Sequence, residues 1–385
     1  MVTIHASNES IPPMPALHLF NQAYIISARN RPSSTYHSNI TPLPSNQLWF
    51  YTAPRQYEPD ASKYAAVGPA AQTPPQGFLE PLIGDLQSAM ANNCPQLTVI
   101  VHGLGTLFAD AVTEMTTLGT GLQQYAGYCG LVISFDWPGY GLLDSSLYYA
   151  SSPYSFPPVK TSGTVRDNIN GTVRAFGNLI EMLQQIRNSL PAVQINFVCH
   201  SEGNYMLMLG MAVLGQQPVL NQVLLVAADI NNGALQQVGA PPDTGQGLPI
   251  SNLSNRVTIY YSKDDDVLPY SETFFRAYHN PSYPDRLGLG GPYSYNAGAL
   301  PANTWGIDCA AVISDTVIRN VPQVPPGTTS HSAYFYIAQV LTDWAATLTG
   351  TAAADVANRV LNPAAEDQQA FIMRYLQPPA ARLLR

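Results

Sequence analysis

The stretch that decides the fold is Gln194-Ile195-Asn196-Phe197-Val198-Cys199-His200-Ser201-Glu202-Gly203-Asn204-Tyr205-Met206-Leu207-Met208-Leu209-Gly210. A short apolar run ends in Cys-His-Ser-Glu-Gly, and a long apolar segment of helix formers follows it. This order predicts a strand, a sharp turn and a helix, with Ser201 at the tip of the turn. A small residue two positions after such a serine lets strand and helix pack closely, and Gly203 meets that need. Cys199 stands two positions before the serine, where glycine is more usual.

Taken alone, these residues also fit an ordinary β–α turn that happens to carry a serine. The rest of the chain favours the more specific interpretation, because apolar runs of strand length recur on both sides. The predicted strands cover residues 48–52, 96–101, 131–135, 194–200, 222–228, 256–261 and 307–313, and the predicted helices cover 78–91, 109–125, 164–190, 203–214, 333–348 and 365–376. Continuous apolar strands that alternate with helices indicate an α/β fold, with a mostly parallel central sheet flanked by helices.

This alternation also defines the expected domains. Residues 1–45 are polar and rich in proline, and we expect an extended arm lying on the surface. Residues 46–350 form the predicted catalytic domain, with possible lid segments at 142–160, 230–254 and 270–304. Residues 351–385 are expected to form a helical tail that packs on the same domain.

Composition limits the classes of protein to which the chain can belong. It has 385 residues, of which 46% are apolar and only 11% are charged, and its formal net charge is -8. A chain of this length and apolar content can bury one large core. Nucleic-acid binding is not expected, because neutralising phosphates requires clustered Lys and Arg, and the sequence has no basic stripe.

Four cysteines bear on metal binding and on compartment. No Cys-x-x-Cys pair occurs, so no zinc site is predicted. Cys94 and Cys129 each precede a predicted parallel strand and could form a disulfide if the protein is exported; the alternative is two buried free thiols. No signal peptide is expected in this chain, and no apolar run reaches transmembrane length. The sparsely charged surface still favours an exported mature form over a cytosolic protein, whereas nothing in the sequence indicates the oligomeric state.

Polar candidate residues follow the carboxyl ends of the predicted strands, which is where parallel sheets bind ligands. A serine hydroxyl is a poor nucleophile near neutral pH, so Ser201 needs a base within reach and an acid to orient that base. Acid and base usually follow a serine on a strand–helix turn. Of the two later histidines, His279 falls late in a predicted helix, whereas His331 lies in a loop. His331 is therefore the predicted base, the alternative for it being a surface-loop residue before a helix.

The acid is sought among the three adjacent carboxylates Asp264, Asp265 and Asp266, which follow the strand at 256–261. Because like charges repel, these carboxylates cannot all be buried. One is expected to turn toward the imidazole while the others stay hydrated. We predict that Asp265 is the acid, with Asp264, Asp266 and Asp229 as alternatives.

A tetrahedral intermediate at Ser201 would need two N–H donors for its oxyanion. The N–H of Glu202, the residue after the nucleophile, is predicted to supply one. The second is expected from the glycine-rich loop after the strand at 96–101, with the Leu104 N–H as the best candidate. The residues predicted to border the substrate are His102, Gly103, Trp137, Tyr140 and His200; for His102 and His200, packing or support of the site is favoured over a role as the base.

These motifs together resemble the α/β-hydrolase superfamily. The residues that carry the resemblance are His102-Gly103-Leu104-Gly105, Asp136-Trp137-Pro138-Gly139-Tyr140-Gly141, His200-Ser201-Glu202-Gly203, Asp265 and His331. More closely, the chain is similar to a poorly characterised bacterial group of serine hydrolases, through Tyr51-Thr52-Ala53-Pro54-Arg55, Val257-Thr258-Ile259-Tyr260-Tyr261-Ser262, Arg286-Leu287-Gly288, Gly291-Pro292, Ile307-Asp308 and His331-Ser332-Ala333-Tyr334-Phe335. The resemblance spans about residues 48–347.

The resemblance implies that Ser201 is the nucleophile, Asp265 the acid and His331 the base of a hydrolase without metal or cofactor. Such enzymes most often cleave carboxylic esters through an acyl-enzyme, although the fold alone does not set the substrate. The Tyr and Pro residues of 142–160 and 270–304 predict an aromatic, uncharged rim, and hence a small neutral ester with an apolar acyl or aryl part. The alternatives are an acyltransferase, amidase, lactonase or peptidase with the same triad, or an inactive hydrolase scaffold that acts as a binding protein.

Overall fold

The computed structural model describes residues 20–29, 47–70, 73–138, 163–212, 220–237, 245–278, 285–295, 298–363 and 369–374, with backbone only for 163–171 and 274–278. Its strands are β1 Ala23–Ser27, β2 Leu48–Ala53, β3 Ala65–Ala70, β4 Gln96–Val101, β5 Leu131–Asp136, β6 Gln194–His200, β7 Leu220–Val226, β8 Ser254–Tyr261, β9 Thr304–Asp308, β10 Arg359–Leu361 and β11 Ala370–Met373. The α-helices are α1 Gln76–Ala91, α2 Phe108–Ala126, α4 Gly163–Ser189, α5 Gly203–Ala212, α6 Leu248–Asn252, α7 Leu268–Tyr278, α8 Leu287–Gly290, α9 Asp315–Ile318 and α10 Ala338–Leu348, and the 3-10 helices are η1 Ala61–Lys63, η3 Ala333–Phe335 and η4 Ala353–Asp355.

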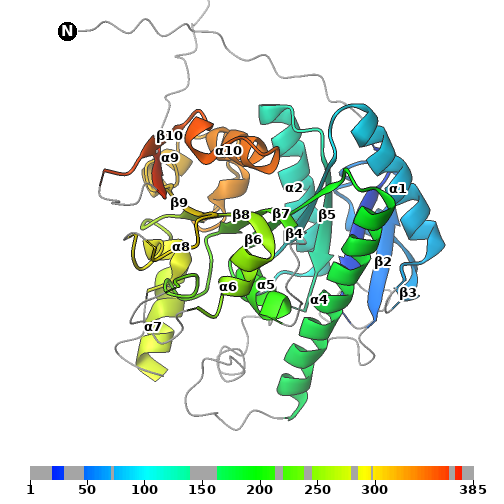
Figure 1. Ribbon diagram of the computed structural model, residues 1–385, viewed down its shortest axis with the longest axis horizontal. Helices are drawn as coiled ribbons and strands as arrows, with labels where there is room; N and C mark the ends of the chain where they lie inside the picture. The colour runs from blue at the N-terminus through cyan, green and yellow to red at the C-terminus, as the bar shows by residue number, and fades with distance from the viewer. Residues whose placement is uncertain are drawn as a thin grey trace, which may run out of the picture.

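The described strands form one sheet in the order β10-β11-β9-β8-β7-β6-β4-β5-β1-β2-β3 (Figure 1). From β11 to β1 every neighbouring pair is parallel, while β2, β3 and β10 each run antiparallel to the strand they join. The carboxyl ends of β4, β6, β7, β8 and β9 therefore meet at one edge. This is the mostly parallel sheet flanked by helices that the sequence pattern predicts.

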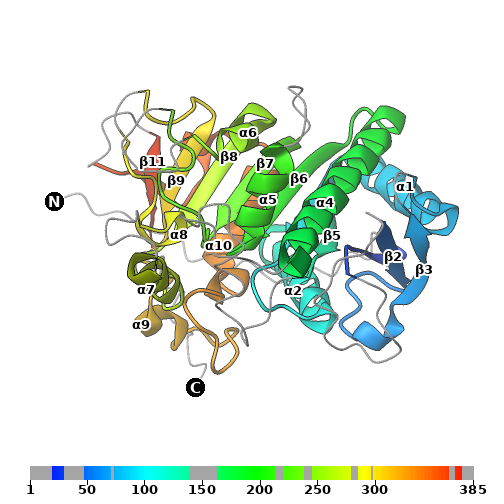
Figure 2. The same cartoon turned by 90° about the horizontal axis from the view of Figure 1, so that it is seen from below.

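Helices cover both faces of this sheet (Figure 2). The side chains of each central strand alternate between the two cores: Val99 packs in the core under α1, α4, α5 and α6, and Ile100 packs in the core under α2 and α10. Because both faces are buried, the central strands must be apolar at nearly every position. That requirement explains the unbroken apolar runs in the sequence.

The amino-terminal segment differs from the expected surface arm of residues 1–45. Ala23–Ser27 forms β1, all five of its residues are buried, and it pairs with β2 on one side and with β5 on the other. The run Ala-Tyr-Ile-Ile-Ser is too short and too isolated among polar residues to stand out from local pattern alone. Its backbone becomes a strand because the edge of β5 offers unpaired hydrogen-bonding groups.

The carboxyl-terminal tail is also different from the predicted helical segment 351–385. Where a helix was expected at 365–376, Ala370–Met373 forms β11, which pairs with β9, and β10 joins it on the outside. The residues around this segment favour helices, but tertiary pairing at a sheet edge overrides such weak local preference. The sheet therefore extends beyond the predicted catalytic domain at both ends.

The segments proposed as lids are only partly described. Residues 142–160 lie outside the described residues, as do parts of 230–254 and 270–304. The described parts of the latter two contain α6, α7 and α8 and the start of β9. Ile250 of α6 and Leu287 of α8 are fully buried in the core, so these parts are built into the domain.

A disulfide joins Cys94 and Cys129 across the amino-terminal ends of the adjacent strands β4 and β5. Their Cα atoms lie 5.6 Å apart, within the usual range for such a bond. The sequence left two states open for these cysteines, a disulfide or two buried free thiols, and the structure has the disulfide. Cys199 and Cys309 are buried free thiols. No helix among the described residues combines the length and the apolarity needed to cross a membrane.

Candidate active site

Ser201 lies in the turn between β6 and α5 with a backbone φ of +54°. This left-handed conformation is unfavourable for a residue with a Cβ, and such strain is typical of a serine on a sharp strand–helix turn. The neighbouring strand end holds the turn, because the Ser201 N–H donates to Val226 O at 3.0 Å and the Asp229 N–H donates to Ser201 O at 3.1 Å. Cys199, which stands where glycine is more usual, is fully buried, and its side chain packs in the core below the turn.

Two glycines bring neighbouring backbone against this serine. A Cβ on Gly203 would lie 2.6 Å from His102 O and closer still to Val101 O, so α5 can begin beside the end of β4 only with glycine here. A Cβ on Gly103 would lie 2.8 Å from Ser201 Cβ and 3.3 Å from Ser201 Oγ. The β4–α2 loop is therefore packed directly against the serine side chain.

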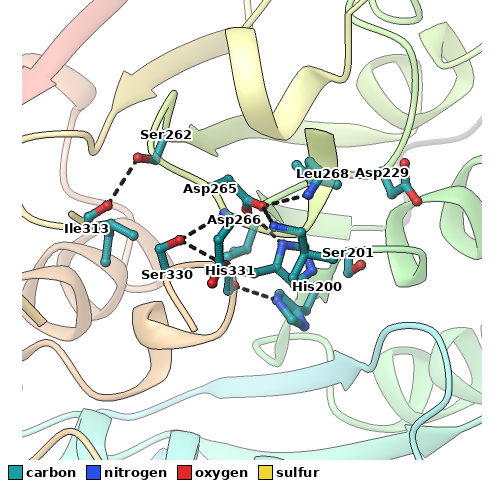
Figure 3. A network of polar contacts seen from close by, with 12 residues as sticks. His200, Ser201, Asp229, Ser262, Asp265, Asp266, Leu268, Ile313, Ser330 and His331 are labelled. Carbon is teal, nitrogen blue, oxygen red and sulfur yellow. Dashed lines mark hydrogen bonds and ion pairs between the residues drawn. The ribbon is translucent and has the colours of Figure 1, made fainter. Parts of the chain in front are cut away.

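His331 and Asp265 form a buried pair at the carboxyl edge of the sheet (Figure 3). His331 Nδ1 lies 2.7 Å from Asp265 Oδ2, and the two side chains are 7% and 0% exposed. The other carboxylate oxygen, Asp265 Oδ1, accepts the N–H groups of Val267 and Leu268 at 2.9 and 2.8 Å at the start of α7. These bonds fix the plane of the carboxylate, so that it presents one oxygen to the imidazole.

The peptide groups of His331 are held on both sides. Its N–H donates to Asp266 Oδ1 at 3.2 Å, and its carbonyl oxygen accepts from His200 Nε2 at 3.0 Å (Figure 3). Ser330 Oγ accepts the Asp266 N–H and lies within hydrogen-bond distance of Asp264 O, which ties the histidine loop to the acid loop. Because His200 directly precedes Ser201, the same contacts bring the His331 loop to the serine turn.

Of the four carboxylates considered from the sequence, Asp265 is the one that contacts the His331 ring. Asp264 is exposed, as expected for a hydrated turn residue. Asp266 is exposed as well, but its bonds to the histidine loop give it more than the hydrated role expected from the sequence. Asp229 is bound elsewhere, because its Oδ1 lies 3.0 Å from Arg286 Nε and accepts the Ser271 hydroxyl at 2.8 Å.

His200 is a buried neutral imidazole beneath the site. Burial and the neighbouring His331 lower its pKa to about 3, so it carries no positive charge at ordinary pH. Its ring centroid lies 4.7 Å from that of His331 and 5.2 Å from that of Phe335. Because Nε2 faces a carbonyl oxygen, Nε2 must carry the proton. His200 therefore supports the His331 loop as a buried residue, which is the supporting role considered for it rather than the predicted position at the border of the substrate.

The two predicted oxyanion donors belong to different loops: Glu202 directly follows Ser201, and Leu104 lies in the β4–α2 loop, whose Gly103 packs against the serine. Glu202 is buried at the start of α5, where main-chain N–H groups have no partner within the helix. Leu104 is half-buried in the β4–α2 loop next to Gly105, whose φ of +70° lets that loop turn sharply. Within the part of the chain that the structure describes, no group of three or more His, Cys, Asp or Glu residues could hold a metal ion.

Two residues predicted to border the substrate are instead part of the packed interior. His102 and Trp137 are 1% and 3% exposed and their rings stack at 5.7 Å. The Trp137 N–H donates to His102 Nε2 at 3.0 Å, and the indole Nε1–H donates to His102 O at 2.8 Å. Their polar atoms thus bind each other rather than facing a ligand. Tyr140 and His279 lie outside the described residues.

Two supporting residues were missed from the sequence. Ser330 directly precedes the predicted base, and its hydroxyl ties the histidine loop to the acid loop. Arg29, in the supposed arm, reaches the β4–α2 loop from the end of β1. The short apolar run Tyr24-Ile25-Ile26-Ser27 before Arg29 is weak evidence for a strand. Only its pairing with β5 shows that Arg29 lies close to the β4–α2 loop.

The sheet order, the strained serine turn and the buried histidine–carboxylate pair define a protein of the α/β-hydrolase fold. Residues 84–279, just over half of the chain, match the model of the family described as "Alpha/beta hydrolase of unknown function (DUF900)". The chain belongs to this family. A search of curated proteins found no match.

Solved structures similar to the chain include three described as esterase-related proteins or cutinases. A lipase-esterase related protein from Clostridium acetobutylicum ATCC 824 is 13% identical, with 46% of this chain and 79% of that chain covered and a TM-score of 0.24. A cutinase-like protein from Cryptococcus sp. is 12% identical (66% and 95% covered, TM-score 0.27), and a Trichoderma reesei cutinase in complex with a phosphonate inhibitor is 12% identical (70% and 87%, 0.25). TM-scores below 0.5 say nothing about activity.

Proposed function

We propose that this protein is a serine hydrolase that cleaves carboxylic esters through an acyl-enzyme intermediate. The observation that carries the proposal is the 2.7 Å contact between His331 Nδ1 and Asp265 Oδ2, both buried, beside a serine with a strained backbone on a strand–helix turn. A base oriented by an ionised acid is what a serine hydroxyl needs to become nucleophilic.

In the proposed reaction, Ser201 Oγ attacks the ester carbonyl carbon while His331 Nε2 takes the hydroxyl proton. Asp265 stabilises the imidazolium that forms. The N–H groups of Glu202 and Leu104 donate to the oxyanion of the tetrahedral intermediate. When that intermediate collapses, the C–O bond to the alcohol breaks and His331 gives the proton to the leaving oxygen.

The second half of the reaction repeats these roles with water. His331 removes a proton from a water molecule, which attacks the acyl carbon. Collapse of the second tetrahedral intermediate releases the carboxylic acid and returns the proton to Ser201. Exposed apolar residues flank the supporting loops: Leu107 follows the β4–α2 loop, and Val267 and Tyr270 follow Asp265. Together with the small share of charged residues in the chain, 11%, they support neutral esters with apolar acyl or aryl groups as substrates.

The test is intact mass after incubation with a fluorophosphonate, run beside turnover of p-nitrophenyl butyrate. We expect one adduct on the wild-type protein and on Ser88→Ala, a control at an exposed helical serine, and neither adduct nor turnover with Ser201→Ala. A p-nitrophenyl ester with a charged acyl group should be cleaved more slowly. If the wild-type protein neither labels nor turns over any ester, an inactive scaffold replaces the proposal. If an added alcohol captures most of the acyl group, the protein is an acyltransferase rather than a hydrolase.

A further inference from the structure

A buried cluster next to the active site has no role in the chemistry proposed above. Arg29, at the end of β1, is 5% exposed and its Nε lies 2.7 Å from Asp136 Oδ1 at the end of β5. Ser27 Oγ donates to the other carboxylate oxygen at 2.6 Å. Burial alone would raise the pKa of Asp136, but the positive charge of Arg29 and the hydrogen bond from Ser27 hold it below its ordinary value. Buried charges are costly even when paired, so an apolar packing of the same volume would do as well for stability alone.

The donors around this ion pair converge on the β4–α2 loop. Arg29 Nη2 donates to Thr106 O at 2.6 Å. His102, whose Nε2 lies 3.2 Å from Asp136 Oδ1, uses its other ring nitrogen, Nδ1, to bond Gly103 O at 3.0 Å. The Trp137 indole holds His102 O. Three carbonyl oxygens within residues 102–106 are therefore held by buried donors.

The proton position on His102 follows from its partners. A carbonyl oxygen only accepts, so Nδ1 carries the proton that bonds Gly103 O. Nε2 receives the Trp137 N–H at 3.0 Å and therefore acts as an acceptor from the main chain. Trp137 also stacks on the ring, so two contacts with Trp137, the stacking and the N–H bond, set the direction of the Nδ1–H.

Holding Gly103 O has a consequence at the proposed oxyanion hole. The carbonyl of Gly103 and the N–H of Leu104 belong to one planar trans peptide and point in opposite directions. Fixing the oxygen toward the His102 ring therefore fixes the Leu104 N–H away from it. Gly103 itself packs against the Ser201 side chain. A rotated peptide at this point would present a carbonyl oxygen where the proposed mechanism needs a donor.

We propose that Arg29 is a positioning residue that holds the β4–α2 loop with its Leu104 N–H in place for the oxyanion. It acts directly through Thr106 O, and indirectly through Asp136 and the adjacent Trp137, which holds His102. This inference rests on the proposed function. It assigns a catalytic consequence to a strand that lies at the start of the chain, far in sequence from Ser201.

The test uses the full chain and four variants. Arg29→Lys keeps the positive charge but lacks a second nitrogen, equivalent to Arg29 Nη2, that could donate to Thr106 O. Arg29→Met combined with Asp136→Asn removes the contact without leaving a buried unpaired charge. His102→Phe keeps a ring against Trp137 but has no Nδ1–H. Arg256→Lys is the matched control, because Arg256 is also multiply hydrogen-bonded but lies at the opposite, amino-terminal end of the strands.

Three quantities are measured for each protein, per active site titrated with fluorophosphonate: kcat, KM, and the inhibition constant of a trifluoromethyl ketone, whose adduct places an oxyanion at the site. We expect kcat to fall about tenfold in Arg29→Lys and about ten- to a hundredfold in His102→Phe and the double variant, less than or equal to the loss of a whole donor. KM should stay within about twofold. The inhibition constant should rise by the same factor as kcat/KM falls, and Arg256→Lys should match the wild type.

A purely structural role would lower the thermal midpoint and the titrated fraction but leave kcat and the inhibition constant per titrated site unchanged, and that result would overturn the inference. An increase in KM with constant kcat would do so too. The failure of the proposed function looks different, because then the wild-type protein itself neither labels at Ser201 nor turns over ester, and the inference falls with it.

Discussion

At the scale of single residues, the two carboxylates beside His331 differ in which atoms they use. Asp265 Oδ1 accepts hydrogen bonds from two main-chain N–H groups, and Asp265 Oδ2 contacts the imidazole of His331. Asp266 keeps its side chain exposed, and its Oδ1 accepts from the Ser330 hydroxyl and the His331 N–H of the histidine loop. Adjacent residues of the same type thus take different tasks because the backbone turns between them.

This difference predicts that replacing Asp by Asn has a large effect on kcat at position 265 and a small one at position 266. In Asp265→Asn the Oδ1 acceptor stays with the two N–H groups, so the amide nitrogen faces His331 Nδ1 and forces the wrong tautomer; kcat should fall about 10³- to 10⁴-fold. Asp266→Asn retains an acceptor for the His331 N–H and should stay within about threefold of the wild type. Steady-state kinetics with p-nitrophenyl butyrate checks both, with the exposed Asp264→Asn as control. Near-normal activity of Asp265→Asn would assign the acid elsewhere.

The neutral His200 predicts a pH dependence of stability. Its pKa is lowered from 6.5 to about 3 in the folded protein, so between these values the unfolded chain binds a proton that the folded protein does not. The stability that this group contributes is complete above about pH 6.5 and is lost as pH falls toward 3. From pH 7 to pH 4.5 the wild type should lose roughly 2 to 3 kcal/mol more than His200→Gln. Urea unfolding at both pH values measures this, and equal losses would contradict it.

At the scale of elements, the sheet is completed by strands from both ends of the chain. β1 inserts between β5 and β2, and β11 pairs with β9. β1 contributes to both cores, because Ile25 packs with the α2 and α10 side and Ile26 with the α1 and α4 side. The position of β1 also lets Arg29 reach the β4–α2 loop.

A surface arm and a central strand respond differently to side-chain truncation. Ile25→Ala and Ile26→Ala should each lower the free energy of unfolding by about 2 to 4 kcal/mol, because each leaves a cavity in a closed core. Leu361→Ala in β10, where the side chain is 51% exposed, is the control and should cost under about 1 kcal/mol. Denaturant unfolding of the three variants decides the matter, and losses at Ile25 and Ile26 as small as at Leu361 would argue against β1 as a core strand.

At the scale of the whole molecule, the chemistry and the cross-link occupy opposite ends of the strands. Ser201, Asp265 and His331 lie where β6 and β8 end, while Cys94 and Cys129 join β4 and β5 where they begin. Disulfides persist in oxidising compartments. A bond at that end stabilises the sheet without touching the site.

The disulfide predicts the number of free thiols and the loss of stability when both of its cysteines are replaced. Two free thiols should be counted in the denatured, unreduced protein, and four after reduction. Cys94→Ala with Cys129→Ala should lower stability by roughly 3 to 4 kcal/mol, given the sequence separation of 35 residues. Ester turnover at 25 °C should be unchanged. Four thiols before reduction would rule the bond out.

Several features could be predicted from the sequence because their causes are local. The apolar runs at β4 to β8 must be unbroken in a sheet buried on both faces, so fold class follows from them. The serine turn can be recognised because a small residue is needed at Gly203. The base could be narrowed to His331, and the acid to Asp229 and Asp264–Asp266, by their places after predicted strands.

Only the tertiary structure decided features whose partners are distant in sequence. β1 and β11 are strands because β5 and β9 offer free edges, which a short segment cannot reveal by itself. Asp265 rather than its neighbours meets His331 because the start of α7 fixes its carboxylate. His102 and Trp137, which the sequence predicts at the substrate, are buried, because the two Trp137 N–H groups bind His102 and His102 Nδ1 binds Gly103 O. Long-range pairing and the cost of burying charge therefore set these details, whereas the local pattern set the fold.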